Sequence, residues 1–338
     1  MKYQKMKNDP ITFIKNKIIE SKNIIITSHL RPDGDSICTS LALYFMGRQM
    51  GKNMSIHIKD NIPFPFNLYP DIELVNSSQI PPEGNDLLIL LECANVSRSG
   101  FDNPENLFKI NIDHHHSNDY YGDINWVDPD ASAVACLVFS LGKKMNIDFT
   151  PKIATQLYSG IVSDTGSFQF SNTNANAFQT CEKLINYGAN PINVSELLFN
   201  NNPPEKIKLL GLVLSTLHMN EEGNIAIITM FKKSLKDLNL KEIDTEDILT
   251  CARSIKGAKI VLFFKEIKQD IFRVSIRSKV KANAAKIAEY FGGGGHLHAA
   301  GFTVSGKYEK ILKEIPAKTS KLLKQSLGNS KKNEPKIY

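Results

Sequence analysis

Long apolar segments are missing from this 338-residue chain. No run of about 18 consecutive apolar residues occurs, so a conventional transmembrane helix is excluded and no membrane association is expected. The first 20 residues contain lysine throughout and no continuous apolar stretch. We therefore expect an amphipathic first helix there rather than a secretory signal peptide.

Cysteines are few and scattered. They form no CxxC pair, and their number is odd, which argues against a disulfide framework and against a zinc–thiolate site. This usage suits a reducing cytoplasm, where we expect the protein to reside. The five cysteines are Cys38, Cys93, Cys136, Cys181 and Cys251.

Positively charged residues are in small excess over negatively charged ones. The net charge of +6 is modest, and no strongly basic stripe lies outside the C-terminal tail. A modest positive balance helps an anionic ligand to approach but does not predict binding of duplex DNA. With 42% hydrophobic and 22% charged residues, the composition is that of a globular protein long enough for two domains.

The first half of the chain alternates short apolar runs with helical patterns. Strands are expected at 23–28, 54–59, 86–94 and 109–116, and helices at 36–51, 132–145 and 151–164. Such alternation, with nearly unbroken apolar strands, predicts an α/β domain with a mainly parallel sheet and helices on both faces. We assign residues 1–186 to this catalytic domain.

The pattern changes after about residue 186. Breakers of the Asn, Pro and Gly type at 187–206 predict a linker, and residues 207–325 are expected to form a second, smaller α/β domain. The polar and basic residues 326–338 predict a disordered tail. Strands of the second domain are expected at 223–230, 257–267 and 271–278.

Residues that ligate metals cluster near the ends of the expected strands. Ligands of α/β sheets bind beyond the carboxyl ends of the strands, so clusters distant in sequence are expected to meet at one edge. Carboxylates with imidazoles suit divalent ions such as Mn²⁺, whose charge several neighbouring carboxylates require. Two close ions suit activation of water for displacement at phosphorus. The candidates are His29, Asp33, Asp35, Glu92, Asp113, His114, His115 and Asp164.

A second candidate site is the glycine run GGGGH at 292–296. Glycines let the backbone approach a ligand closely and offer N–H groups to a phosphate. Arg277, on a preceding strand, has a planar guanidinium group whose N–H donors suit a bidentate contact with a phosphate. We expect a clamp for a terminal phosphate or a base, with a flexible turn as the alternative. For Asn172, substrate contact and an ordinary turn are both open.

Several motifs, in order, resemble those of a known family. SHLRPDGDS, IDHHHSN and GIVSDTGSFQFSNT resemble the DHH phosphoesterases, and RS at 277–278 with FGGGGHLHAAGF at 291–302 resembles their C-terminal DHH-associated domain. The match runs over nearly the whole chain. Its length resembles the compact members, which are nanoRNases, pAp phosphatases and linear or cyclic dinucleotide phosphodiesterases.

The resemblance implies a role for each matching residue. Two Mn²⁺ ions would be bound, with Mg²⁺ or Co²⁺ as substitutes. Glu92 would bridge the ions, Asp113 would orient a ligand histidine, and His115 would face the phosphate as a donor or general acid. The other implied ligands are His29 and Asp33 for one ion, and Asp35, His114 and Asp164 for the other. The implied substrate contacts are Asn172, Arg277, Ser278, Gly293, Gly294, Gly295 and His296.

Two positions depart from the pattern of the family. The family usually has Asp where Glu92 stands, and the extra methylene still allows a bridge between two ions. The alternative is that Glu92 no longer contacts the ions and a water takes its place. Cys136 stands where many relatives carry Glu, and nothing in the sequence explains it.

The resemblance implies a Mn²⁺-dependent phosphodiesterase that cleaves short nucleotides to nucleoside 5′-monophosphates. Its substrate is left open between short oligoribonucleotides, cyclic di-AMP with its linear product pApA, and pAp, on which it would act as a 3′-phosphatase. A homodimer is also left open. The rival of another class is a nucleotide-binding regulatory protein with impaired catalysis, which only Glu92 favours.

Overall fold

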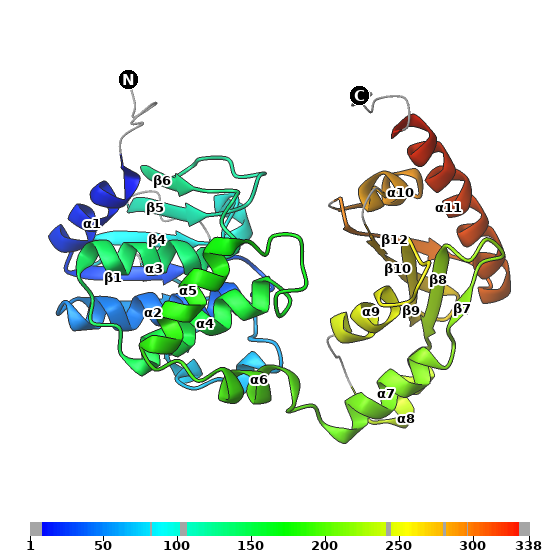
Figure 1. Ribbon diagram of the computed structural model, residues 1–338, viewed down its shortest axis with the longest axis horizontal. Coiled ribbons are helices and arrows are strands. Elements are labelled where there is room, and N and C mark those ends of the chain that lie inside the picture. The colour runs from blue at the N-terminus through cyan, green and yellow to red at the C-terminus, as the bar shows by residue number, and fades with distance from the viewer. Residues whose placement is uncertain are drawn as a thin grey trace. The chain divides into compact units, whose positions relative to one another are not determined.

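A computed structural model of the chain describes residues 9–81, 83–101, 107–240, 245–279, 282–295 and 297–330. Contacts divide the chain into two compact units, Met1–Asn201 and Asn202–Tyr338, which are described separately (Figure 1). Among the described residues, no helix combines the length and the apolar character that a membrane span requires.

The first unit is built on a six-stranded parallel sheet with the strand order β3-β2-β1-β4-β5-β6. The chain adds strands on one side of β1 and then returns to add the rest on the other side. The carboxyl ends of β1 and β4 therefore flank the point where the order reverses, which is where ligands bind in open sheets of this kind. The strands are β1 (Asn23–Thr27), β2 (Asn53–His57), β3 (Val75–Asn76), β4 (Leu87–Leu91), β5 (Phe108–Asp113) and β6 (Ile124–Val127).

Both faces of this sheet are buried, as the unbroken apolar strands predict. The buried residues of the helices share one core with Ile24 and Ile26 of β1. The opposite face, with Ile25 and Leu88, is covered by non-helical segments that include Cys93. The helices described therefore lie on one face and not on both. Unbroken apolar strands indicate that both faces of a sheet are buried, but they do not indicate which segments cover each face. The helices are α1 (Pro10–Glu20), α2 (Gly34–Gln49), α3 (Val134–Met145), α4 (Pro151–Asp164), α5 (Ala175–Asn186) and α6 (Pro191–Phe199).

Helix α2 begins at Gly34 because Asp33 caps it. The Asp33 carboxylate accepts from the backbone N–H of Ser36, and the Ser36 hydroxyl accepts from the backbone N–H of Asp33, which is a capping box. The helix contacts both β2 and α4, and the segment 34–43 is buried throughout. The cap starts the helix two residues before the expected segment 36–51.

The second unit contains a mixed six-stranded sheet with the order β11-β12-β10-β9-β8-β7. Only β8 and β9 pair in parallel; the other neighbouring strands are antiparallel. Two cores cover its two faces. The strands are β7 (His218–Met219), β8 (Ile225–Met230), β9 (Ile260–Lys268), β10 (Ile271–Ser278), β11 (Gly294–Gly295) and β12 (Ala299–Ser305). The helices are α7 (Pro204–Leu214), α8 (Lys232–Asp237), α9 (Glu246–Arg253), α10 (Ala284–Tyr290) and α11 (Tyr308–Ser330).

Two expected irregular segments contain helices. The expected linker 187–206 includes α6 and the first turn of α7. Helix α11 continues to Ser330, into the segment from residue 326 that the sequence predicts as a tail. Residues 331–338 lie outside the described residues.

Candidate active site

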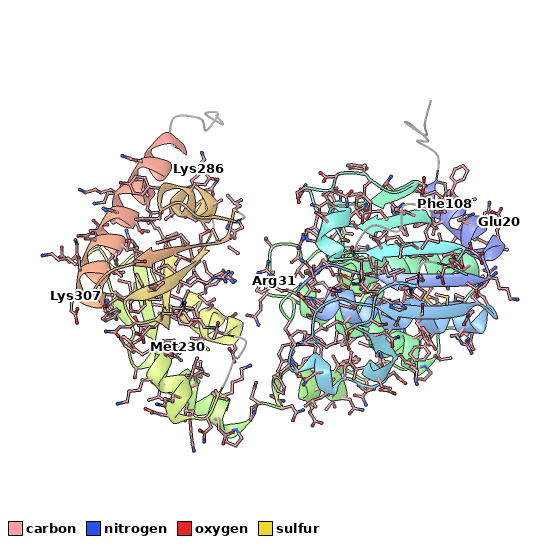
Figure 2. The ribbon with its side chains drawn as sticks, turned by 180° about the vertical axis from the view of Figure 1, so that it is seen from behind. Glu20, Arg31, Phe108, Met230, Lys286 and Lys307 are labelled. Carbon is pink, nitrogen blue, oxygen red and sulfur yellow. The ribbon has the colours of Figure 1, made fainter. Side chains whose placement is uncertain are left out.

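The candidate metal ligands of the first unit lie at one edge of its sheet. Figure 2 shows Arg31, just beyond β1, at the opposite end of the unit from Phe108, the first residue of β5. The strands are parallel, so the carboxyl ends of β1, β4 and β5 meet on the Arg31 side. His29, Glu92 and His114 follow these three strands by one or two residues.

His29 and Asp33 form the first pair. His29 is buried, and its Nδ1–H donates to the carbonyl of Leu30 at 2.8 Å. In the neutral ring this bond leaves Nε2 as the unprotonated nitrogen, and Nε2 lies 3.7 Å from Asp33 Oδ2. Because Asp33 Oδ1 is used for the helix cap, Nε2 of His29 and Oδ2 of Asp33 are the atoms available to a cation.

Asp35 serves the fold as well as the site. Its fully buried carboxylate accepts from the backbone N–H groups of Val134 at 2.5 Å and Ala135 at 3.1 Å, so it caps α3 from another helix. The hydroxyl of Thr39 donates to it at 2.8 Å. A Cβ at Gly160 would lie 2.7 Å from Asp35 Oδ1, so the glycine lets α4 approach this carboxylate.

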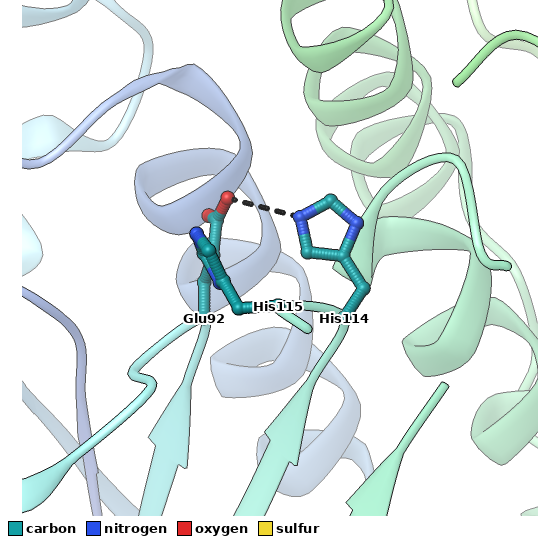
Figure 3. A group of neighbouring side chains, drawn as sticks. All are labelled: Glu92, His114 and His115. Atoms are coloured by element: carbon teal, nitrogen blue, oxygen red, sulfur yellow. Dashed lines mark ion pairs between the residues drawn. The ribbon is translucent and has the colours of Figure 1, made fainter. Parts of the chain in front are cut away.

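Glu92 stands in a left-handed backbone conformation, with φ of 54°, directly after β4. Its carboxylate is 1% exposed, and Oε2 has no hydrogen-bond partner among the described residues. Oε1 lies 3.6 Å from His114 Nε2 (Figure 3). A buried carboxylate oxygen without a donor is costly unless a cation compensates it.

His114 and Asp164 come from different elements. The Nδ1–H of His114 donates to the carbonyl of Ala131 at 3.0 Å, which turns Nε2 toward Glu92 and toward Asp164 Oδ2, 3.8 Å away. Asp164, the last residue of α4, is held by Asn172, whose amide donates to Oδ2 at 3.0 Å. The amide nitrogen of Asn172 thus contacts a candidate ligand.

His115 lies beside these groups in a different arrangement. Its Nδ1 lies 2.7 Å from Asp113 Oδ1, and the backbone N–H groups of His114 and His115 also point to that oxygen. Burial opposes the charge of Asp113, but hydrogen bonds from His115 and Asn118 outweigh it and hold the pKa of Asp113 below its usual range. Asp113 therefore orients the ring of His115. The resemblance implies that Asp113 orients a ligand histidine, and His115 is itself a candidate ligand.

Three groups of side chains have the geometry of metal sites. They are Glu92 with His114 and His115, His29 with Asp33 and Glu92, and Asp35 with His114 and Asp164; within each group the ligand atoms lie within 4.8 Å of one another. Figure 3 shows the first of them beyond the ends of two neighbouring strands. Glu92 belongs to two groups and so does His114.

The electrostatics of this cluster of carboxylates and histidines favour bound cations. Burial and nearby carboxylates raise the pKa values of Asp35 and Glu92 above their usual range, and burial together with Asp35 raises the pKa of Asp164 to about 7. Divalent ions would remove this conflict. Carboxylates with imidazoles suit Mn²⁺ or Mg²⁺ better than soft ions, so the residues fit the metals that the sequence predicts.

The second unit carries the other predicted residues. Arg277 and Ser278 end β10, and the Ser278 hydroxyl, 3.2 Å from the carbonyl of Leu297, donates toward it. Within the glycine run, Gly294 and Gly295 form the short edge strand β11, whereas Gly292 lies in a turn. A Cβ at Gly293 would lie 2.2 Å from the carbonyl of Gly301, and one at Gly295 would lie 2.4 Å from the Cα atom of Ala300, so both glycines permit the pairing. Around Gly294 the space is open. His296 lies outside the described residues.

Residues 23–161 match the DHH family, N-terminal domain, and residues 222–321 match the DHHA1 domain. The bifunctional oligoribonuclease and PAP phosphatase NrnA of Thermus thermophilus is 32% identical over 297 residues, covering 86% of this chain and 89% of that protein. The protein of the same name from Bacillus subtilis is 29% identical, covering 83% of this chain and 89% of its own length. This chain belongs to the DHH family.

Membership of the DHH family makes the chain a metal-dependent phosphoesterase. A solved structure of an exopolyphosphatase-related protein from Bacteroides fragilis shares the fold, with a TM-score of 0.82 and 24% identity over 94% of this chain and 97% of that one. The resemblance that the motifs indicate is thereby confirmed.

The DHH motifs do not show every contact that builds the site. The side chain of Asn118 is a partner of Asp113, and the carbonyl of Ala131 orients His114. Asn118 is the last residue of the motif IDHHHSN, but neither this motif nor the sequence around Ala131 shows which atoms these two groups contact. Cys136 is buried in α3, where burial raises the pKa of its thiol, and nothing in the structure gives it a role.

Glu92 leads to a prediction about metal binding. Glu92→Asp is expected to keep both ions, because Asp adopts the left-handed conformation more readily than Glu and retains the carboxylate. Glu92→Ala is expected to lose more than about tenfold in Mn²⁺ affinity, since outer partners of metal ligands alone contribute about 10- to 100-fold. Titration of the metal-free protein with Mn²⁺ measures this. Two ions bound to Glu92→Ala as tightly as to wild type would refute the bridge.

Proposed function

We propose that this chain is a Mn²⁺-dependent phosphodiesterase that hydrolyses short nucleotides, such as pApA, cyclic di-AMP or oligoribonucleotides, to nucleoside 5′-monophosphates. The observation that carries the proposal is the shared position of Glu92 and His114 in adjoining ligand groups. Two neighbouring ions fit this arrangement better than one, and paired ions suit displacement at phosphorus.

The side chains divide into two ligand sets. His29, Asp33 and Glu92 would hold one ion, and Glu92 would be shared with a second ion. The remaining ligands of that second ion would be Asp35, His114 and Asp164. When bound, the ions would lower the pKa of an attacking water and stabilise charge on the phosphoryl oxygens. Hydrogen bonds keep these ligands in place: the rings of His29 and His114 donate to the carbonyls of Leu30 and Ala131, and the amide of Asn172 donates to Asp164.

His115 would give a proton to the leaving oxygen. Its Nδ1 is held by the buried carboxylate of Asp113, its side chain is 26% exposed, and Nε2 is the nitrogen left to contact a substrate. A histidine oriented by a carboxylate through one nitrogen acts as an acid or base through the other. Protonation matters for a ribose oxygen, which leaves poorly as an alkoxide.

The second unit would hold the rest of the nucleotide. Arg277 is a candidate for a bidentate contact with a phosphate, and the exposed edge of β11 offers backbone groups around Gly294. Ser278, Gly293 and Gly295 would shape that surface, together with His296. The names of the relatives support a nucleotide-sized substrate, since NrnA is called an oligoribonuclease and PAP phosphatase.

Removal of a 3′-phosphate from pAp is the second candidate activity, favoured by the same names. We also propose a cytoplasmic location, because the five cysteines are free and four of them are buried. Catalytic impairment, the rival reading, finds little support, because the ligand set around Glu92 has the geometry of a metal site.

The full chain, stripped of metal and reloaded with Mn²⁺ or Mg²⁺, tests the proposal. Its kcat/KM on pApA, cyclic di-AMP, pAp, a labelled RNA pentamer and pyrophosphate would rank the substrates. We expect turnover of at least one nucleotide with Mn²⁺ and none with chelator. Tight binding of these nucleotides without hydrolysis would favour the regulatory protein instead.

A further inference from the structure

Three buried or half-buried asparagines lie behind the DHHH segment at intervals of seven residues: Asn111, Asn118 and Asn125. Asn111 Nδ2 donates to Asn118 Oδ1 at 2.9 Å and to Asn125 Oδ1 at 3.3 Å. The amides form a ladder across β5 and β6 on the face of the sheet that non-helical segments cover. Buried polar groups of this kind stabilise one arrangement when each has a partner.

Asn118 is the member of this ladder that touches the catalytic groups. It is 8% exposed, and its Nδ2 donates to Asp113 Oδ2 at 2.5 Å. Its Oδ1 accepts from Asn111 and from the backbone N–H of Tyr120, 2.8 Å away. Both ends of the amide are therefore used, and the ring of His115 is linked to the ladder through Asp113.

The two oxygens of Asp113 have separate partners. Oδ1 faces His115 and two backbone N–H groups, whereas the side-chain amide of Asn118 is the partner described for Oδ2. Asp113 is fully buried, so loss of the amide would leave a carboxylate oxygen without a donor. Without the amide of Asn118, the Asp113 carboxylate would rotate or bind a water molecule. The His115 ring, which Asp113 orients, would then lose its fixed orientation.

We propose that Asn118 is a positioning residue that fixes His115, through Asp113, for proton donation to the leaving oxygen of the substrate. This inference rests on the proposed function, in which His115 is the donor. It predicts that Asn118 matters for substrates whose leaving oxygen needs a proton and matters little for substrates whose leaving group departs as a stable anion.

The test compares Asn118→Ala on pApA and on bis-p-nitrophenyl phosphate. On pApA, kcat is expected to fall by about 10- to 100-fold, the usual effect of removing a partner that orients a catalytic group, with KM changed less than about threefold. On bis-p-nitrophenyl phosphate both constants should change less than about threefold, because nitrophenolate leaves without a proton. Equal losses on the two substrates would overturn the proposal.

Asn125→Ala is the matched control. It removes an amide from the same ladder, but Asn125 contacts Asn111 and Gly122 and not Asp113. We expect it to keep the kcat of wild type on both substrates. If Asn125→Ala reproduces the selective loss, the ladder acts through the fold in general, and the assignment to Asn118 is wrong.

A double-mutant cycle with His115→Ala separates positioning from other effects. If Asn118 acts through His115, adding Asn118→Ala to His115→Ala should lower kcat on pApA no further. An additive loss would contradict the inference. If His115→Ala itself keeps wild-type activity on pApA, the donor assignment in the proposed function is the part that fails.

Folding is checked on each variant by thermal unfolding and by the number of Mn²⁺ ions bound. Should Asn118→Ala not fold, Asn118→Ser replaces it, because its hydroxyl fills part of the space but is shorter than the amide. The expected result is the same selective loss on pApA with two bound ions. An Asn118→Ser variant that folds and keeps full kcat on pApA would overturn the proposal.

Discussion

Replacing Asp164 with asparagine is expected to lower kcat/KM for phosphoester hydrolysis by at least about 100-fold while leaving the metal-free protein at least as stable as wild type. The substitution removes one charge from the group of Asp35, His114 and Asp164 without changing the size of the side chain. Loss of an ion forfeits several kcal/mol of transition-state stabilisation, which corresponds to about a 10²- to 10³-fold fall in kcat/KM.

The stability part of the prediction follows from the sign of the pKa shift. Burial and Asp35 raise the pKa of Asp164 from 3.8 to about 7, so the folded, metal-free protein disfavours the ionised form. That cost is absent at a pH below 3.8, where the carboxyl is neutral in both states, grows as the pH rises toward 7 and is complete above it. Asparagine carries no such charge, so its advantage should grow over the same range.

Urea unfolding of metal-free wild type and Asp164→Asn at several pH values measures the difference. Asp148→Asn is the control, because Asp148 is an exposed carboxylate outside the ligand groups. Asp35 is less suitable for this test, since its carboxylate also caps α3 and its loss would disturb the fold. Near-normal hydrolysis by Asp164→Asn would rule out its place among the metal ligands.

The sequence predicts the longer central strands of both sheets because their apolar runs are unambiguous, whereas the short strands β3, β6, β7 and β11 were not expected. The run LLILL becomes β4 with every residue buried, and IFRVSIRS becomes β10 with a largely alternating pattern. The second face of the first sheet could not be predicted in the same way. Its cover includes Cys93, Leu107 and Tyr121 from segments without periodicity, held by bonds such as that from the Tyr121 hydroxyl to the carbonyl of Cys93.

The candidate site was predictable where a motif directly follows a strand. His29 and His114 meet at one edge because β1 and β5 run parallel on either side of β4. The sequence could not show which hydrogen-bond partner each polar atom of the site has. The spacing of DHHH does not show that Asp113 turns to His115 while a carbonyl orients His114. That carbonyl belongs to Ala131, 17 residues further along the chain and outside the motif.

Glycines gave the least specific signal. A run of glycines is compatible with a mobile turn or with a close approach, and only the pairing of Gly294 with Gly301 distinguishes them. The missing Cβ atoms at Gly293 and Gly295 are required by β12, which is a structural reason for two of the glycines. The contribution of Gly294 to substrate binding remains a prediction.

Arg277→Ala is expected to lose most of its activity on pApA and to keep its activity on bis-p-nitrophenyl phosphate. Arg277 ends β10 in the second unit, whereas the candidate metal ligands belong to the first. It should therefore act by positioning the nucleotide and not on the chemical step, so its loss should matter little for a small diester that does not depend on this contact. Loss of a bidentate, charge-assisted contact with a phosphate costs about 2–3 kcal/mol, or about a thirtyfold to hundredfold fall in kcat/KM.

Steady-state kinetics on the two substrates measures this difference, with two variants for comparison. Arg273→Ala removes an exposed arginine four residues earlier on the same strand and should behave as wild type on both substrates. His29→Ala should lose both activities, because it removes a candidate metal ligand. An Arg277→Ala variant that slows both substrates equally would show that Arg277 does not position the nucleotide, and the edge of β11 would then be a structural element of its sheet.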